Sequence, residues 1–192
     1  MAAAMKGRPY LVNEAALPPG YWHSLLNGNG LSEEWSPPKY KIERNGGKLG
    51  DVLGWIGGVP LYSERAKNLL AELSGSTVKF HRLGEIKGSM YWVMAAISSA
   101  DVLDEEHSEV QRAQNGMIRS VQRFSFNSFL DNAPAIFCLP GRADCEIFAK
   151  KEVPKAVVEM GFTGFQFRDP EVPSLRRMYL GEDVNAYPGV KP

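Results

Sequence analysis

Apolar residues along this chain recur in short runs, and their spacing predicts a few short helices among β-strands. Residues 63–73 carry apolar side chains at helical spacing behind Ser63, a residue type that is preferred at the helix N-cap. We therefore expect a helix over 63–73. Residues 78–82 alternate apolar and polar side chains, 87–89 have turn composition, and 90–97 are nearly all apolar. This pattern predicts a strand pair whose second strand is buried on both faces.

The second half of the chain is expected to contain antiparallel strands and one more helix. The predicted strands span residues 118–126, 135–139 and 146–149. Val153-Pro154 opens a helix, since proline is tolerated in the first helical turn. Gly161 stands where a left-handed C-terminal cap belongs. We expect the chain to return from this cap as a final strand over 162–167.

Prolines, glycines and asparagines interrupt residues 1–60 so often that long elements are excluded there. Tyr10–Val12 fits a short edge strand. Aromatic residues are interleaved with the turn-forming ones, which is typical of a segment that covers a core. We therefore expect a single α+β domain over residues 1–192. It is mainly an antiparallel sheet with a few short helices, and it comprises an irregular aromatic-rich N-terminal cap (1–60), a core (61–168) and a Pro-containing tail (169–192).

Composition and charge narrow the classes of partner. The chain is 44% hydrophobic and 23% charged, which is ordinary for a globular protein. Lys+Arg and Asp+Glu are equal at 22 each, so no global positive field attracts nucleic acid or an anionic membrane. No apolar run approaches the ~20 residues of a membrane helix, and the first residues do not form a secretory signal. We expect a cytoplasmic protein that binds neither nucleic acid nor membrane.

The densest group of ionisable residues spans Asp101 to His107. One interpretation is a metal site or an acid/base pair, which together with His81 would make the chain an enzyme. The other is a solvated turn in which Asp101 or Asp104 caps the next helical turn. The second is favoured because no ligand spacing is specific and no His-rich segment completes a site. No phosphate-binding or dinucleotide motif occurs, so no cofactor is expected.

Two further features have a functional and a structural interpretation. A two-residue turn at Gly141-Arg142 would place Cys138 opposite Cys145, close enough for a redox-sensitive disulfide. Two buried free thiols are favoured, since cytosolic disulfides are rare. The tryptophans of the N-terminal cap could line a small-ligand pocket, although ordinary core coverage is favoured. They are Trp22, Trp35 and Trp55.

Several short motifs occur in a fixed order along residues 60–168. A helix start with paired leucines is followed by a strand leading into Asp-x-x-Asp-x-x-x-Ser, then by an Ile-Phe strand and a helix closed by Gly-x-Thr-Gly-x-x-Phe. The motif residues are Ser63, Arg65, Leu69, Leu70, Asp101, Asp104, Ser108, Ile136, Phe137, Gly161, Thr163, Gly164 and Phe167. In order and spacing they resemble a bacterial immunity-protein family of polymorphic toxin systems, the myxobacterial-type immunity domain.

This resemblance implies a protein that is not an enzyme and that binds and neutralises a cognate toxin, whose gene lies nearby. Its motif residues have structural roles, such as the cap at Ser63, and so do not locate a binding site. Many such toxins act on nucleic acids through basic clefts, and an acidic surface would steer that encounter. The carboxylates expected to contact the toxin are Asp101, Asp104, Glu105 and Glu106. The oligomeric state is left open.

Overall fold

The computed structural model describes most of the chain between residues 10 and 172. The described residues are 10–14, 16–17, 21, 35–43, 48–55, 60–95, 97–112, 114, 116, 118–140 and 146–172. Their fold is α+β, with mainly antiparallel strands and two short α-helices, as the sequence predicts. None of the helices in these ranges is long and apolar enough to cross a membrane.

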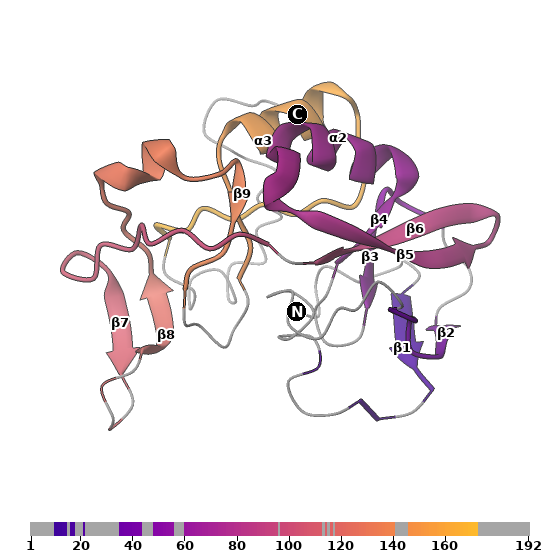
Figure 1. Cartoon of the computed structure of the whole chain (residues 1–192), viewed down its shortest axis with the longest axis horizontal. Helices are drawn as coiled ribbons and strands as arrows, with labels where there is room; N and C mark the ends of the chain where they lie inside the picture. The colour runs from indigo at the N-terminus through magenta and orange to yellow at the C-terminus, as the bar shows by residue number, and fades with distance from the viewer. Residues whose placement is uncertain are drawn as a thin grey trace.

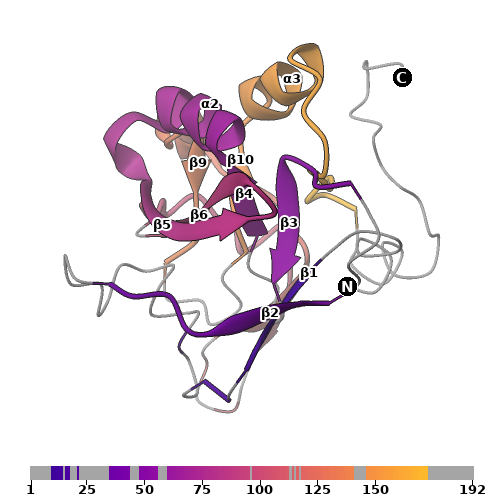
Figure 2. The same cartoon turned by 90° about the vertical axis from the view of Figure 1, so that its right-hand side faces the viewer.

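Six strands form the main sheet. They are β1 (Tyr10–Asn13), β2 (Tyr40–Glu43), β3 (Val52–Trp55), β4 (Pro60–Ser63), β5 (Lys79–Ile86) and β6 (Ser89–Ala95). Their order in the sheet is β2-β1-β3-β4-β6-β5. Strands β1 and β3 run parallel, whereas the other neighbouring pairs are antiparallel. The helix that follows β4 lies over the β4–β6 part of this sheet, and the second helix lies beside it. Both are on the side away from β1 and β2 (Figures 1 and 2).

Strands β1, β2 and β3 belong to the first 60 residues, so the sheet reaches further into the N-terminal part than expected. The strand at Tyr10–Val12 is confirmed, but its expected edge position is wrong, because β1 pairs with both β2 and β3. Each of these strands is four residues long. Strands this short among turn-forming residues carry no signal of their partners, which come from distant parts of the chain.

The predicted strand pair is the β5–β6 hairpin. Its turn consists of Lys87 and Gly88, whose φ angles of 48° and 81° are both left-handed, as in the tight turns that match strand twist. Strand β5 extends beyond Arg82 to Ile86, because a bulge at Gly84, with φ of 138°, lets the pairing continue. Strand β6 is buried on both faces over its last three residues, Val93 to Ala95, in agreement with the prediction of a buried strand.

Helix α2 (Glu64–Ser74) begins as the sequence predicts. The Ser63 hydroxyl oxygen accepts a hydrogen bond from the Ala66 backbone N–H at 3.3 Å, which satisfies one of the free N–H groups of the first turn. Ala66, Leu69 and Leu70 are buried on its inner face. The helix ends at Gly75, which leads into the 3₁₀ turn η1 (Gly75–Thr77).

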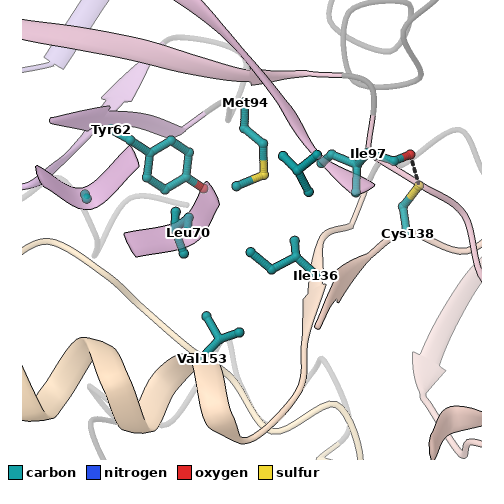
Figure 3. Close-up of a cluster of buried hydrophobic side chains, with 9 residues drawn as sticks. Tyr62, Leu70, Met94, Ile97, Ile136, Cys138 and Val153 are labelled. Atoms are coloured by element: carbon teal, nitrogen blue, oxygen red, sulfur yellow. Dashed lines mark hydrogen bonds between the residues drawn. The ribbon is translucent and has the colours of Figure 1, made fainter. Parts of the chain in front are cut away.

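The core between the sheet and the two helices is drawn in Figure 3. Helix α3 (Glu152–Glu159) contributes Val153, and α2 contributes Leu70. The buried cluster contains Tyr62, Ala66, Leu70, Val78, Met94, Ile97, Ile136, Cys138 and Val153. Burial of this apolar surface at ~25 cal/mol per Å² is the main force that holds the helices on the sheet.

The opposite face of the sheet has its own core, which the N-terminal part covers. Its buried members are Leu53, Leu61, Leu83, Ile86, Tyr91, Val93 and Ala95. Trp35, Tyr40, Ile42 and Leu49 pack against them while half-exposed. Trp35 therefore covers a core, as expected, whereas Trp22 and the Trp55 side chain lie outside the described residues.

The second half forms two small sheets rather than one. Strand β7 (Glu109–Arg112) pairs with β8 (Ile118–Arg123), and after the 3₁₀ turn η2 (Ser128–Asn132) strand β9 (Ile136–Phe137) pairs with β10 (Phe148–Ala149). The β7–β8 hairpin extends away from the main sheet (Figure 1). A third buried cluster lies between these sheets. It contains four phenylalanine rings, and the centroids of the contacting rings are 5.0 to 6.4 Å apart. The rings are those of Phe124, Phe126, Phe137 and Phe148.

The predicted strands of this half are present but shorter than the expected ranges 118–126, 135–139 and 146–149. Strand β7 was not predicted, because Glu109–Arg112 is too polar to signal a strand.

The predicted cap after α3 is confirmed, because Gly161 ends the helix in the left-handed region, at φ of 65°. The expected strand over 162–167 is wrong. Gly164 turns the chain at φ of 95°. The Phe162 and Phe165 rings, which would face opposite sides of a regular strand, lie 6.1 Å apart between centroids.

The predicted register of the two cysteines is also wrong. Phe137 pairs with Phe148, so the position opposite Cys138 is two residues beyond Cys145. The two-residue turn at Gly141-Arg142 does not fit this register, and residues 141–145 lie outside those described. The Cys138 thiol is buried near the Ile97 carbonyl at 3.6 Å (Figure 3), and burial raises its pKa. A protonated buried thiol is unreactive.

Candidate functional site

The acidic segment is a tight turn organised by one of its own carboxylates. The Asp104 side chain accepts hydrogen bonds from the backbone N–H groups of Glu106 and His107 at 3.1 and 3.2 Å. It also contacts the His107 ring nitrogen Nδ1 at 2.8 Å. The favoured interpretation, a solvated turn capped by Asp104, is therefore confirmed. These bonds stabilise the charged form and lower the pKa of Asp104, chiefly through His107.

Other contacts fix the turn at the base of the β7–β8 hairpin. The Ser108 hydroxyl accepts from the Ser125 N–H at 2.9 Å and donates to the Ser125 carbonyl. The Asp104 N–H donates to the same carbonyl at 2.9 Å. The motif residues Asp104 and Ser108 thus join the start of β7 to the end of β8.

Some of the carboxylates in this region form ion pairs with arginines. Glu105 forms an ion pair with Arg112, and Glu109 forms one with Arg123 at 2.9 Å. Asp101 and Glu106 are exposed, and no hydrogen bond or ion pair joins their side chains to another described residue. The structure thus brings the four predicted carboxylates into one segment, but two of them serve the turn and its hairpin.

A second group of motif residues meets around Asp51, far away in sequence. The Asp51 carboxylate accepts from the Ser63 hydroxyl at 3.0 Å and from the Thr163 N–H at 2.9 Å. The Arg65 Nε lies 3.1 Å from it. The side chain of Asp51 is only 13% exposed, so these bonds form in partly desolvated surroundings. This group joins the start of β3, the N-terminus of α2 and the turn after α3.

Two further contacts tighten this junction. The Arg65 guanidinium donates to the Met160 carbonyl at 3.1 Å and lies over the Phe162 ring, 4.1 Å from its centroid. The Tyr91 hydroxyl donates to the Gly50 carbonyl at 2.7 Å. Burial raises the pKa of Tyr91 to about 12, and the neighbouring Asp51 carboxylate adds to the rise.

The junction explains why the motifs occur together. Ser63, Arg65 and Thr163 all bind Asp51, and Gly161 and Gly164 supply the positive φ angles that bring Thr163 to it. Asp51 itself was missed by sequence reasoning. A lone aspartate in a glycine-rich loop gives no signal, since its partners lie 12 and 112 residues further along the chain.

A shallow groove opens beside this junction, between α2 and the end of α3. Its volume is about 390 Å³. Its lining residues are Arg65, Asn68, Leu69, Glu72, Met160 and Phe162. The groove is open to solvent, and Met160 is 57% exposed at its edge. Such a groove suits a side chain of a protein partner better than an enclosed small ligand.

The geometry gives little support to the enzyme interpretation. Among the described residues, no group of three His, Cys, Asp or Glu side chains could hold a metal ion. His81 lies on β5 against the Trp35 ring, at 5.5 Å between centroids, and burial followed by the nearby Lys79 lowers its pKa. His81 therefore has the surroundings of a packed histidine. Its described neighbours do not include the carboxylates of the Asp101–His107 turn, with which it would have to form an acid/base pair.

Comparison with known proteins agrees with the motif pattern. The sequence model of the Imm11 family, described as an immunity protein family, matches residues 3–172. The match covers the N-terminal strands, both helices, the acidic turn and the junction. A comparison with curated proteins finds no match.

Proposed function

Because this chain belongs to the Imm11 immunity protein family, we propose that it binds a cognate bacterial toxin and neutralises it, protecting the producing cell and its kin. The family match over residues 3–172 is the observation that carries this proposal. Protection comes from binding alone, without an enzymatic reaction or a cofactor. The complex forms in the cytoplasm, and the partner is a protein, not nucleic acid or membrane.

The partner is the toxin encoded by a neighbouring gene of the same polymorphic toxin system. Binding covers the active site of the toxin or locks it in an inactive conformation. Such an interface buries at least ~1,200 Å² in total and concentrates its energy in a few anchor residues. Both the hairpin base and the α2–α3 groove are exposed surfaces from which such anchors can project.

Co-expression with the product of the neighbouring gene tests the function. The neighbouring product alone is expected to arrest growth, and the chain is expected to restore growth and to co-purify with that product. A chain with the destabilising core substitution Phe137→Ala serves as the negative control and should protect less well, because protection requires the folded chain. If no neighbouring product is toxic, or if growth stays arrested although both proteins accumulate, the proposal fails.

The acidic turn contributes contacts to the same interface. Of the four carboxylates proposed to contact the toxin, Asp101 and Glu106 are exposed and have no polar partner among the described residues, whereas Asp104 and Glu105 hold the turn in shape. Exposed charges of this kind accelerate association with a basic partner more than they slow dissociation.

We therefore expect the double substitution Asp101→Lys/Glu106→Lys to slow association with the toxin by about tenfold at low salt. Thermal unfolding should stay unchanged, since both side chains are exposed and have no hydrogen bond or ion pair with another described residue to lose. Stopped-flow or biosensor kinetics measure the effect, and Glu152→Lys/Glu171→Lys provides a charge-matched control. Equal association rates for both double variants would show that the acidic turn does not contribute to the interface.

A further inference from the structure

The lining of the α2–α3 groove comes largely from one stripe of α2. Arg65, Asn68, Leu69 and Glu72 are spaced i, i+3, i+4 and i+7, so they face the same side of the helix. Leu69 is buried and gives the groove an apolar floor. Met160 stands across from the stripe and is one of the large apolar side chains exposed in the described part of the chain.

The two ends of this stripe differ in charge. At the N-terminal end, the Arg65 guanidinium is neutralised by Asp51, bound to the Met160 carbonyl and stacked on Phe162. At the C-terminal end, Glu72 is exposed, and its side chain has no hydrogen bond or ion pair with any described residue. Seven residues separate them, or ~10.5 Å along the helix axis, which exceeds the ~8 Å screening length at physiological salt.

The position of Glu72 is electrostatically unfavourable for the free protein. It lies in the last turn of α2, where the backbone dipole is negative, and that turn contains no basic residue. Cations, not anions, stabilise this end of a helix. A residue that opposes local helix stability and has no polar partner among the described residues is a candidate for contact with a partner protein.

From this pattern we infer that the groove binds a lysine or arginine side chain of the cognate toxin. The methylene stem lies against Leu69, Met160 and Phe162, and the cationic head pairs with Glu72 at the negative end of α2. A long basic side chain meets both requirements, since its stem is apolar and its head is charged. This inference rests on the proposed function, and it assigns the toxin a basic anchor at the interface.

The test compares toxin binding by the wild type, Glu72→Gln and Glu72→Lys. We expect the Kd to rise about three- to tenfold for Glu72→Gln and at least ~30-fold for Glu72→Lys, with a weaker salt dependence for both. Glu72→Lys should unfold at the same temperature as the wild type or higher, because lysine suits the helix C-terminus. Weakened binding in a variant that is no less stable cannot be attributed to misfolding.

Two more variants separate the alternatives. Glu85→Lys, an exposed glutamate of β5, is the charge-matched control and should bind like the wild type. Met160→Ala should weaken binding about three- to tenfold by removing contact with the stem. If Met160→Ala weakens binding and Glu72→Lys does not, the groove takes an apolar side chain and the basic anchor is wrong.

The remaining outcomes also decide the matter. If the wild-type chain does not bind the toxin, the proposed function fails before the groove is tested. If the wild type binds and both Glu72 variants bind equally well, the function stands and the inference is overturned. If sedimentation of the chain alone reveals a dimer that Glu72→Lys dissociates, a second copy occupies the groove and the inference is likewise overturned.

Discussion

Replacing Phe137 by alanine is expected to lower the free energy of unfolding by about 3–5 kcal/mol. The ring is 2% exposed and packs 5.5 Å from the Phe148 ring and 6.4 Å from the Phe126 ring, measured between centroids. The substitution removes buried apolar surface and leaves a cavity that these rings cannot fill. Domains are typically stable by 5–15 kcal/mol, so this loss is a large part of the total.

Urea unfolding followed by fluorescence or circular dichroism measures the loss. Phe129→Ala is the matched control, because Phe129 is 65% exposed and its truncation creates no cavity. The control should change stability by less than ~0.5 kcal/mol. Similar values for the two variants would contradict the role given to the phenylalanine cluster in holding the β7–β8 and β9–β10 sheets together.

Asp51→Ala is expected to destabilise the chain by about 2–3 kcal/mol. It removes the acceptor of the Ser63 hydroxyl and of the Thr163 N–H, and it leaves the Arg65 guanidinium without its carboxylate. Because Arg65 and the Phe162 ring line the groove, the variant should also weaken toxin binding. The same substitution thus links the family motifs to the proposed interface.

Thermal and urea unfolding of two companion variants separate the contributions. Thr163→Val keeps the backbone bond to Asp51 and loses the hydroxyl contacts, so about 1 kcal/mol should be lost. Asp101→Ala removes an exposed carboxylate and should cost less than ~0.5 kcal/mol. The junction would not be a structural centre if Asp51→Ala proved as harmless as Asp101→Ala.

The elements that the sequence predicted well are those whose local signals agree. Helix α2 has an N-cap serine and an apolar face, and both appear in the structure at the predicted place. The β5–β6 hairpin has an apolar run and a Lys-Gly turn, and Gly161 closes α3. Here backbone propensity, capping and hydrophobic spacing all favour the same structure.

The elements that the sequence did not predict depend on long-range contacts. Strand β7 is polar and exists because it pairs with β8 and is anchored by Ser108. Residues 162–167 look like a strand in composition. Thr163 is held by the Asp51 carboxylate, and its carbonyl accepts a backbone hydrogen bond from Val52 at the start of β3, but no ladder with β3 continues along the described segment. Pairing of this kind is set by the tertiary fold and not by local composition.

The candidate site was predictable only in part. The acidic run identified the turn, since a cluster of carboxylates is visible in any sequence, but not that Asp104 and Glu105 are used internally. The groove was not predictable, because Met160 and Glu72 are 88 residues apart and meet only through the packing of α2 and α3. The charge of Glu72, unpaired among the described residues, indicates a basic partner only once the structure shows that Arg65 is neutralised by Asp51.

Titration of the purified toxin with the purified chain tests the central claim, neutralisation by binding, most directly. The toxin is held at a fixed concentration well above the Kd, and its own activity is followed as the chain is added. We predict that activity falls linearly and reaches zero at an equimolar ratio, as expected for a tight complex that blocks the toxin. Full toxin activity in the presence of excess folded chain would contradict the account.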